Sequence, residues 1–429
     1  MFKNKRIYVI PAIGFLIIIL LSSLVLTLPI SQKNPISFFD TLFVATSAFS
    51  GTGFSTFNIL ENLTLFGQIM LLLTVQIGTL GFMIFFAFIL SIRHKKIKLS
   101  NTLILSNEIN FDNYTKVSDR TSKIIKYTFV IEFFGAMLLA IKFVPDFGII
   151  KGIWYGIFHS ISAFCNAGFD LLGNNSFASY TNDIYINIIL IGLMLLGGLG
   201  YFVLEDIVQC IKDRKKHLQV HSKIILVTSV WLIFISTILF KIFSPNVTIL
   251  QALFNTVTAR NTGFASIDFS LLDNASKMLI LILMFIGGAA GSSAGGIKLT
   301  TLAIIILFPI SVVKGEDIIV FFRKIDSKMI RRAYTIFSFY VFLTIIGFFI
   351  LLETNSNISS IDLLFELISA FSNTGVGTFD INLLNKIGKS ILILYMYIGR
   401  LGPITLFTLF SFNHKKSNEI TYVNADLML

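Results

Sequence analysis

Long apolar stretches recur along the chain and predict helices that cross a membrane. A membrane-spanning helix needs roughly 20 mostly apolar residues, and eight stretches have that character. The first follows basic residues, as a secretion signal does, but its apolar run is longer than that of a typical signal and no small-residue cleavage site ends it. We therefore predict that it is retained as a helix. The eight stretches lie at about 7–30, 65–91, 124–144, 184–210, 223–243, 277–308, 333–352 and 388–412.

Four shorter apolar stretches each follow the first span of a pair. They are too short to cross a membrane and suit re-entrant half-helices. They cover Ser37–Phe49, Gly152–Phe164, Thr248–Ala259 and Ser360–Phe371. We predict an all-α integral membrane protein with four repeats of span, half-helix and span around a central pore. The expected repeats are residues 1–95, 96–215, 216–315 (with an interrupted second helix) and 316–412, followed by a tail at 413–429.

Composition and charge support a membrane location. The chain has 429 residues, of which 55% are apolar and only 13% are charged, against about 25% charged in soluble domains. Of its 34 Lys and Arg residues, 24 lie on the side that carries both termini and 7 on the other. Basic residues favour cytoplasmic loops. The net charge of +11 therefore indicates a plasma-membrane protein with both termini in the cytoplasm, not a nucleic-acid-binding protein.

The half-helices end in similar sequences. The pattern Phe-x3-Ser-Ala-Phe-x3-Gly ends at Gly53, Gly168 and Gly375, and a looser version ends at Gly263. The pentapeptides around these glycines are SGTGF, CNAGF, RNTGF and SNTGV. The candidate site residues are Ser50, Gly51, Thr52, Gly53, Cys165, Asn166, Ala167, Gly168, Asn261, Thr262, Gly263, Ser372, Asn373, Thr374 and Gly375.

A second glycine motif follows each of these glycines by 24–29 residues. It begins at Gly78, Gly197, Gly287 and Gly399. A single glycine pair in a membrane helix indicates only close helix packing, because membrane interfaces favour small residues. Two motifs that each recur four times at similar separation indicate an internal fourfold repeat. Because each repeat has two spans, successive repeats run in parallel, unlike the inverted repeats of many carriers.

The first motif suits a cation. Irregular backbone at membrane depth is tolerated where it lines a water-filled path or is buried in protein, and rings of backbone carbonyls can replace the hydration shell of K⁺. The negative, C-terminal end of each half-helix favours a cation at the same place. The alternative is that these glycines only allow tight packing of a helix against a loop.

The same residues carry a family resemblance that covers nearly the whole chain. The chain resembles the membrane subunit of the Trk/Ktr/HKT potassium transporter superfamily, and its first span suits the Ktr type. The resemblance implies a K⁺ selectivity filter at the four pentapeptides. Some plant members carry serine at the first filter glycine and favour Na⁺, so Gly53 implies K⁺. It further implies a homodimer on a cytoplasmic nucleotide-binding ring, docked at the basic linkers 91–126 and 311–332.

The resemblance also implies an intramembrane gate. The stretch GGAAGSSAGGIK matches the family's gating loop, and GRLGP matches the segment that carries its pore arginine. The implied gate residues are Gly287, Gly288, Ala289, Ala290, Gly291, Ser292, Ser293, Ala294, Gly295, Gly296, Lys298 and Arg400.

Four ionisable residues lie in apolar surroundings. We interpret Arg400 as a positive barrier on the pore, with structural pairing to carbonyls as the alternative, because a lone charge at membrane depth costs at least about 2.5–3.5 kcal/mol. Lys298 is expected to cap carbonyls or to meet a carboxylate. For Arg260, bracing of the third filter and a position on the outer surface are equally open. Glu132 is expected to pair with Lys126 or Lys123.

No catalytic constellation or ATP-binding loop competes with transport. Potassium uptake down an electrochemical gradient is the predicted function. The predicted ligand is K⁺, held by filter carbonyls only; no cofactor is expected, and Na⁺ is left open as a coupling or regulatory ion. The alternatives are a sodium-permeable or weakly selective path of the same fold, and a membrane carrier or enzyme that binds an anion at Arg400 and Lys298.

Overall fold

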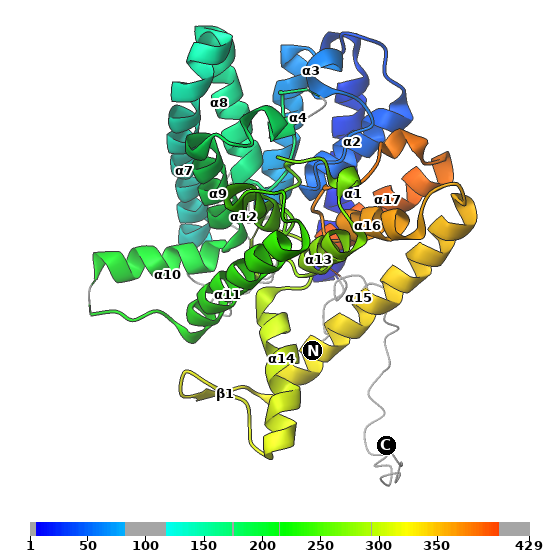
Figure 1. Ribbon diagram of the computed structural model, residues 1–429. Coiled ribbons are helices and arrows are strands. Elements are labelled where there is room, and N and C mark those ends of the chain that lie inside the picture. Colours follow the sequence, from blue (N-terminus) through cyan, green and yellow to red (C-terminus); the bar gives the residue numbers. More distant parts are fainter. Residues whose placement is uncertain (1–5, 82–116, 174–175, 214, 293, 403–429) are drawn as a thin grey trace.

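Helices dominate the computed structural model, which describes residues 6–81, 117–173, 176–213, 215–292 and 294–402 (Figure 1). One order of elements recurs four times: a first helix, a short half-helix, a surface turn and a second helix. In repeat 1 these are α1 (Arg6–Thr27), α2 (Phe38–Ser50) and α4 (Leu65–Leu80), with η1 (Pro29–Ser31) and α3 (Ile59–Asn62) between them.

The other repeats follow this order. Repeat 2 has α7 (Val117–Phe147), α8 (Ile149–Phe164), η3 (Ser176–Tyr180), α9 (Ile184–Gly198) and α10 (Tyr201–Lys212). Repeat 3 has α11 (Val220–Phe243), α12 (Ile249–Thr258), η4 (Phe269–Leu271), α13 (Asn274–Phe285) and α14 (Leu299–Lys314), followed by the hairpin β1 (Ile319–Val320) and β2 (Arg323–Lys324). Repeat 4 has α15 (Ser327–Thr354), α16 (Ser360–Phe371), η5 (Ile381–Leu383) and α17 (Lys386–Leu401).

The second helix of every repeat starts with the same kind of cap. A Thr, Asp or Asn side chain accepts a hydrogen bond from the backbone N–H three residues later, which satisfies one of the free donors at a helix start. The capping residues are Thr64, Asp183, Asp273 and Asn385. The local sequence therefore starts these four helices at equivalent positions.

The repeats close into a ring. The second helix of each repeat packs against the half-helix of the next: α4 on α8, α9 on α12, α13 on α16, and α17 on α2. Large side chains of the half-helices, such as Phe43, Phe158 and Phe365, are fully buried by this packing. The half-helices therefore lie inside the ring.

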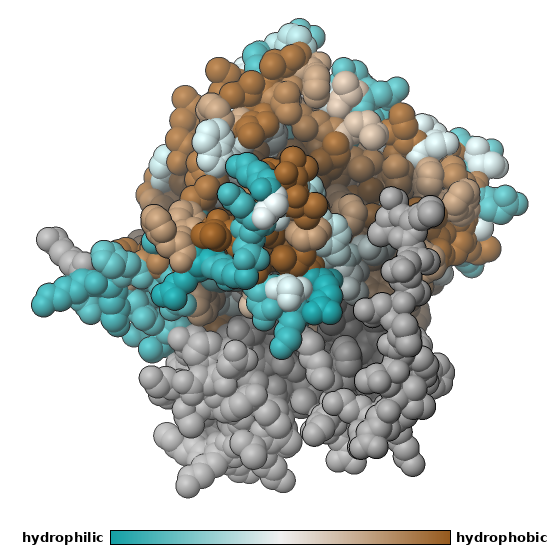
Figure 2. Space-filling model, turned by 90° about the horizontal axis from the view of Figure 1, so that it is seen from below, coloured by the Kyte–Doolittle hydropathy of each residue, from teal (hydrophilic) through white to brown (hydrophobic). Residues whose placement is uncertain are grey.

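The outer helices present apolar side chains outward. Within the described residues, α1, α7, α11 and α15 are long and apolar enough to cross a membrane, and the bent pair α9–α10 would add a fifth span. The exposed apolar residues of these helices include Ile17, Phe133, Trp231 and Phe349. A large continuous apolar surface of this kind is unfavourable in water. Seen from below, the wall is largely hydrophobic and hydrophilic residues gather on the projecting segments (Figure 2).

Three of the predicted second spans need correction. The stretch 184–210 is not one straight helix, because α9 and α10 meet at an angle of 103°. The helices in 65–91 and 388–412 end at Leu80 and Leu401, before Gly81 and Gly402, and residues 82–91 and 403–412 lie outside the described part of the chain. Left-handed glycine conformations stop a helix at little cost.

The predicted repeat boundaries fall at different kinds of place. Those at 215/216 and 315/316 lie in the α10–α11 connection and just beyond α14. Those at 95/96 and 412/413 lie outside the described residues, as does the C-terminal tail.

Candidate functional site

The four motif glycines form a closed ring. A Cβ atom added to any one of them would lie within 2.6 Å of a carbonyl oxygen in the next repeat. The short segments that carry these glycines, called the motif strands below, therefore touch in the order of repeats 1, 2, 3, 4 and back to 1. All four have positive φ, between 67° and 99°, which glycine adopts readily. The pairs are Gly53 with Ala167 O, Gly168 with Thr262 O, Gly263 with Thr374 O, and Gly375 with Thr52 O.

The strands leave their half-helices through similar turns in three repeats. Gly51, Asn166 and Asn373 adopt left-handed conformations, which Gly and Asn tolerate best. The next residue then donates its N–H to a carbonyl five positions back, as Thr52 does to Ser47 at 2.9 Å. Repeat 3 differs: Asn261 has no positive φ, and Thr262 donates to Thr258 four positions back. Its divergent sequence thus has a divergent turn.

Side-chain hydrogen bonds tie neighbouring strands together. Thr262 donates to Asn166 Oδ1 at 2.8 Å, joining repeats 3 and 2. Asn373 donates to the Thr52 hydroxyl at 3.1 Å, joining repeats 4 and 1. Some side-chain oxygens at the ring, such as Asn373 Oδ1, have no hydrogen-bond partner among the described residues. The backbone carbonyls are the oxygen atoms that all four repeats contribute.

The first glycines of the second motif support the half-helices from behind. A Cβ on Gly78, Gly197 or Gly399 would overlap the carbonyl oxygen at the end of the half-helix in the same repeat, which belongs to Phe49, Phe164 or Phe371. In repeat 3 the equivalent Gly287 faces Gly295 and Gly296 instead. These glycines therefore serve close packing, and the loop after Gly287 takes the place of a half-helix contact.

Except for Arg400, which lies in α17, the described gate residues form a non-helical loop between α13 and α14. Its two ends are pinned together by Gly287 N–H to Ile297 O at 2.9 Å and Ile297 N–H to Phe285 O at 3.1 Å. One side contacts repeat 2, where Ala289 N–H donates to Gly198 O at 3.0 Å. The other side meets repeat 4, because a Cβ on Gly295 would overlap Ser372 O.

The loop therefore reaches both neighbours of repeat 3, which stand opposite each other in the ring. Ser293, one of the predicted gate residues, lies outside the described residues.

Two of the cationic side chains contact backbone carbonyls. Arg400 donates to Gly78 O and to Thr79 O, the latter at 2.8 Å, across the contact of repeats 4 and 1. Those carbonyls close the last turn of α4, where a cation is favourable. Lys298 donates to Ala294 O at 2.5 Å, as the carbonyl-capping alternative expects.

The prediction that Glu132 pairs with Lys126 or Lys123 is wrong. Its carboxylate accepts two hydrogen bonds from Gln76 Nε2, at 2.9 and 3.0 Å, and is buried. Lys123 instead lies 3.7 Å from Glu205. Glu132 lies on the side of α7 that faces α4 of repeat 1. Spacing along the sequence does not show which neighbouring helix a given side of α7 contacts.

Arg260 is buried, which excludes the outer-surface alternative. Its side chain lines a cavity between repeats 2 and 3.

Sequence analysis missed a set of buried polar groups behind the ring. Glu366 accepts a hydrogen bond from Thr378 N–H at 2.8 Å, and His159 from Leu171 N–H at 3.1 Å. Each of these residues directly follows the first phenylalanine of its motif. Each accepts its hydrogen bond from the residue three positions after the motif glycine. A polar residue on the buried side of an apolar half-helix was the available signal.

The described residues contain no group of three or more His, Cys, Asp or Glu side chains that could hold a metal ion. The oxygen ring is the arrangement in the described structure that fits a monovalent cation.

A family model described as TrkH, cation transport protein, matches residues 12–421. The chain belongs to the TrkH family of cation transport proteins. As a member of this family it is a transporter subunit of the Trk/Ktr superfamily with an all-α, multi-pass membrane fold, and it is not an enzyme.

Other TrkH-family proteins resemble it along their length. The chain is 36% identical to "Potassium/sodium uptake protein NtpJ" of Enterococcus hirae, covering 97% of this chain and 96% of the relative. It is 33% identical to "Ktr system potassium uptake protein B" of Bacillus subtilis, covering 97% and 95%. The crystal structure of the potassium transporter TrkH from Vibrio parahaemolyticus matches with a TM-score of 0.77 at 19% identity, covering 95% of this chain and 85% of that one. This last match supports the fold.

Proposed function

We propose that this chain takes up K⁺ across the plasma membrane through the ring formed by its four motif strands. The single observation that carries the proposal is the closed contact of Gly53, Gly168, Gly263 and Gly375, each against a carbonyl oxygen of the next repeat. Carbonyl rings coordinate K⁺ in place of water. The names of the relatives from B. subtilis and E. hirae agree with this ion.

The loop at 287–296 is the proposed gate. It comes from repeat 3 and contacts repeats 2 and 4 on opposite sides of the ring. Its residues are all small, so the loop can move to another position with few steric clashes. Arg400 and Lys298 both donate hydrogen bonds to backbone carbonyls in this structure.

The proposed partners are a second copy of the chain and a cytoplasmic ring of nucleotide-binding subunits. Exposed basic residues gather in the segments that project at the lower end in Figure 1. An acidic or dipolar docking face would be attracted there, and the preference of basic residues for cytoplasmic loops supports a cytoplasmic position for these segments. The exposed basic residues include Lys212, Lys215, Lys216, Lys314, Arg323, Lys324, Lys328, Arg331 and Arg332.

Sodium is the second candidate ion. The name of the E. hirae relative includes both potassium and sodium. In this alternative Na⁺ passes through the same ring or is coupled to K⁺. It uses the same oxygen atoms, so selectivity is the property that separates the two candidates.

Uptake in cells that lack other K⁺ transporters tests the proposal. Expression of this chain with its cytoplasmic partner should restore growth at low K⁺, and ⁸⁶Rb⁺ uptake should resist a tenfold excess of Na⁺. Folded, membrane-inserted protein that gives no K⁺ or Rb⁺ flux would contradict the proposed function. Flux that Na⁺ abolishes in proportion to its concentration would favour the sodium-permeable alternative.

A further inference from the structure

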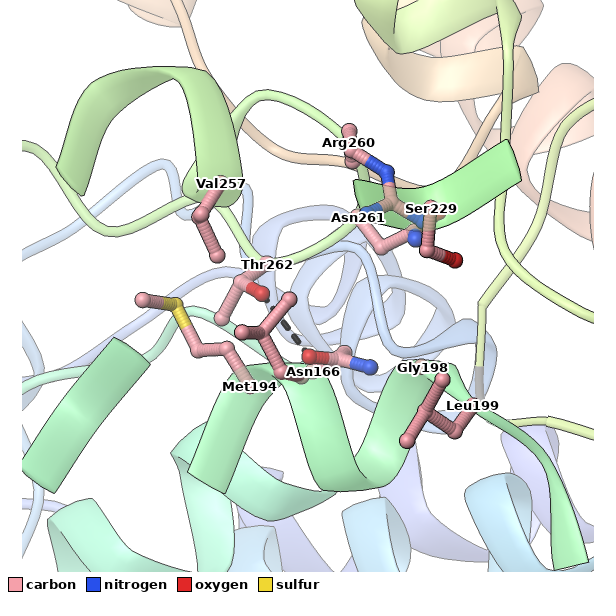
Figure 3. A pocket seen from close by; sticks show the side chains of 10 residues that line it. Asn166, Met194, Gly198, Leu199, Ser229, Val257, Arg260, Asn261 and Thr262 are labelled. Atoms are coloured by element: carbon pink, nitrogen blue, oxygen red, sulfur yellow. Dashed lines mark hydrogen bonds between the residues drawn. The ribbon is translucent and has the colours of Figure 1, made fainter. Parts of the chain in front are cut away.

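A small cavity lies between repeats 2 and 3, behind the third motif strand. Its volume, measured as room for the centre of a water-sized sphere, is about 20 Å³, enough for one small occupant. Arg260, Asn261 and Ser229 gather along one side of it, and Asn166 and Thr262 along another (Figure 3). Apolar side chains of α9 close the remaining wall.

Three residues that line this cavity each carry a buried polar atom without a hydrogen-bond partner among the described residues. The atoms are Arg260 Nε, Asn261 Oδ1 and Ser229 Oγ. The three residues are only 4%, 4% and 5% exposed. A buried polar atom without a partner costs roughly 1–3 kcal/mol and calls for an explanation. Three such atoms around one cavity indicate that something occupies it.

The charge of Arg260 selects the kind of occupant. Guanidinium stays protonated in proteins, and within the described chain no carboxylate lies within 4.0 Å of it. A buried charge is costly unless it is paired. A water molecule would fill the space and bind Ser229, but it would leave the positive charge uncompensated.

We propose that this cavity is a binding site for a small monovalent inorganic anion, of which chloride is the probe. Arg260 supplies the positive charge and an N–H donor, and the Ser229 hydroxyl supplies a second donor. The Asn261 side chain supplies a third after a half-turn, because its amide oxygen and nitrogen occupy equivalent positions. The small volume excludes phosphate or sulfate.

The position of the site gives the anion a role. Arg260 precedes Gly263 by three residues, so its Cα lies within about 11 Å of the motif ring along the chain. An unpaired positive charge there would repel a cation in the ring, and a bound anion would cancel that repulsion. The site itself is independent of which cation the ring conducts.

Crystals of the full chain grown or soaked in bromide provide the direct test. Anomalous scattering should place a bromide ion between Arg260 and Ser229. A water molecule or no density at that position, in crystals with bromide elsewhere in the solvent, would overturn the proposal. This measurement needs no variant, so a folding defect cannot obscure it.

Thermal unfolding of the detergent-solubilised protein gives a second test, at constant K⁺ and ionic strength. Chloride or bromide, compared with gluconate, should raise the midpoint of the unmodified protein. Arg260→Gln should abolish the rise, and Ser229→Ala should increase the halide concentration for half effect about tenfold, since one hydrogen bond to a charged group is worth about 1.5 kcal/mol.

Ser222→Ala is the matched control. Ser222 is also a buried serine of α11 whose hydroxyl has no partner among the described residues, and it does not line the cavity. Its replacement should leave the halide response unchanged. An equal response in Ser222→Ala and Ser229→Ala, or an equal midpoint in halide and gluconate, would contradict the site.

Discussion

Gly53 shows at the scale of one residue why the motif glycines resist replacement. Its φ is 99°, and a Cβ there would lie 2.6 Å from Ala167 O in the next repeat. A side chain therefore meets two separate penalties, one from its own backbone and one from the ring. The backbone penalty is about 1–2 kcal/mol, and the contact penalty falls on the carbonyl oxygens proposed to bind the ion.

We predict that Gly53→Ser raises Na⁺ permeation relative to K⁺ at least about fivefold. The added atoms displace Ala167 O and widen the ring, and a loss of about 1 kcal/mol of selectivity corresponds to that factor. Tracer flux in proteoliposomes measures the ratio. Gly148→Ser is the matched control, because Gly148 has a φ of 83° and no atom within 4 Å of its added Cβ. An unchanged ion ratio in Gly53→Ser would remove Gly53 from the filter.

Arg400 combines a charge with two hydrogen bonds to the end of α4, and two variants separate these roles. If its charge is a barrier on the pore, Arg400→Gln should raise K⁺ flux per folded molecule several-fold, while Arg400→Lys keeps flux near the original. Two charges about 6 Å apart at an effective dielectric of about 20 repel by roughly 3 kcal/mol. Flux is measured per folded protein.

The structural alternative for Arg400 gives the opposite pattern. Both variants would lower the yield of folded protein, because neither Gln nor Lys reproduces the paired contact with Gly78 O and Thr79 O. Flat normalised flux in Arg400→Gln would exclude the barrier role.

At the scale of the element, the second helices stop at equivalent glycines. Gly81, Gly200 and Gly402 have φ values of 86°, 84° and 79°. Gly81 and Gly402 follow α4 and α17 directly, and Gly200 follows α9 after one intervening residue. In repeat 2 the backbone then turns into α10, and the loop of repeat 3 fills the corner. Ala289 N–H donates to Gly198 O, and Tyr201 N–H donates to Gly291 O at 3.1 Å. The α9–α10 corner and the proposed gate are therefore one hydrogen-bonded unit.

We predict that Gly200→Ala loosens the proposed gate and raises K⁺ flux without the cytoplasmic partner two- to fivefold, roughly the effect of 0.5–1 kcal/mol. The new Cβ would lie 2.9 Å from Ala290 O, so the loop must shift. Flux through proteoliposomes that hold the chain alone measures the effect.

Gly402→Ala controls for backbone strain. Gly402 has a similar conformation, with ψ of 141° against 147° at Gly200, and no described atom lies within 4 Å of its added Cβ. Similar flux changes in both variants would show that the loop contact is irrelevant.

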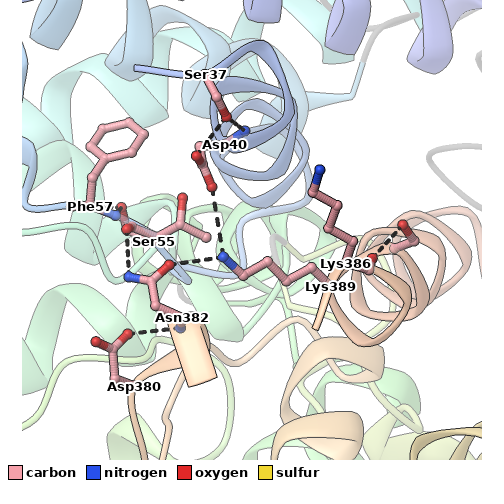
Figure 4. A network of polar contacts seen from close by, with 10 residues as sticks. Ser37, Asp40, Ser55, Phe57, Asp380, Asn382, Lys386 and Lys389 are labelled. Carbon is pink, nitrogen blue, oxygen red and sulfur yellow. Dashed lines mark hydrogen bonds and ion pairs between the residues drawn. The ribbon is translucent and has the colours of Figure 1, made fainter. Parts of the chain in front are cut away.

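Over the whole molecule, polar side-chain contacts join neighbouring repeats. Repeats 4 and 1 meet where Lys389 lies 3.8 Å from Asp40 and donates to Asn382 at 2.9 Å, while Asn382 donates to Thr56 O at 2.8 Å (Figure 4). Repeats 3 and 4 meet through Lys277 and Asp362 at 2.9 Å. These contacts help to hold the chain as a closed ring.

We predict that Lys277→Met lowers the unfolding free energy by about 2 kcal/mol and that Lys389→Met lowers it by less than about 1 kcal/mol. The Lys277–Asp362 pair is short, with side chains 11% and 22% exposed, so the loss falls between those of surface and buried pairs. The Lys389–Asp40 pair is longer, and Asp40 is 30% exposed. Thermal unfolding in detergent gives both values, and an equal loss would refute the ranking.

The sequence by itself determined the elements and their fourfold order. The half-helix Ser360–Phe371 has the predicted bounds, and α2, α8 and α12 lie within three residues of theirs. A break at Gly287–Gly296 was also predicted, and the structure has it between the end of α13 at Phe285 and the start of α14 at Leu299. These features depend on local properties: apolar run length, capping side chains, and glycine clusters that a helix does not tolerate. Recurrence in four copies made weak local signals specific.

Only the tertiary structure decided which groups meet. Glu132 binds Gln76 of another repeat, the loop joins repeats 2 and 4, and Arg260 faces a cavity instead of the surface. The bend at Gly200 also escaped the sequence, because an apolar run continues across it. Each of these depends on the ring closing, which brings together residues far apart in the chain. Spacing along a helix fixes a residue's direction, whereas its partner is fixed by the neighbouring helix that packs there.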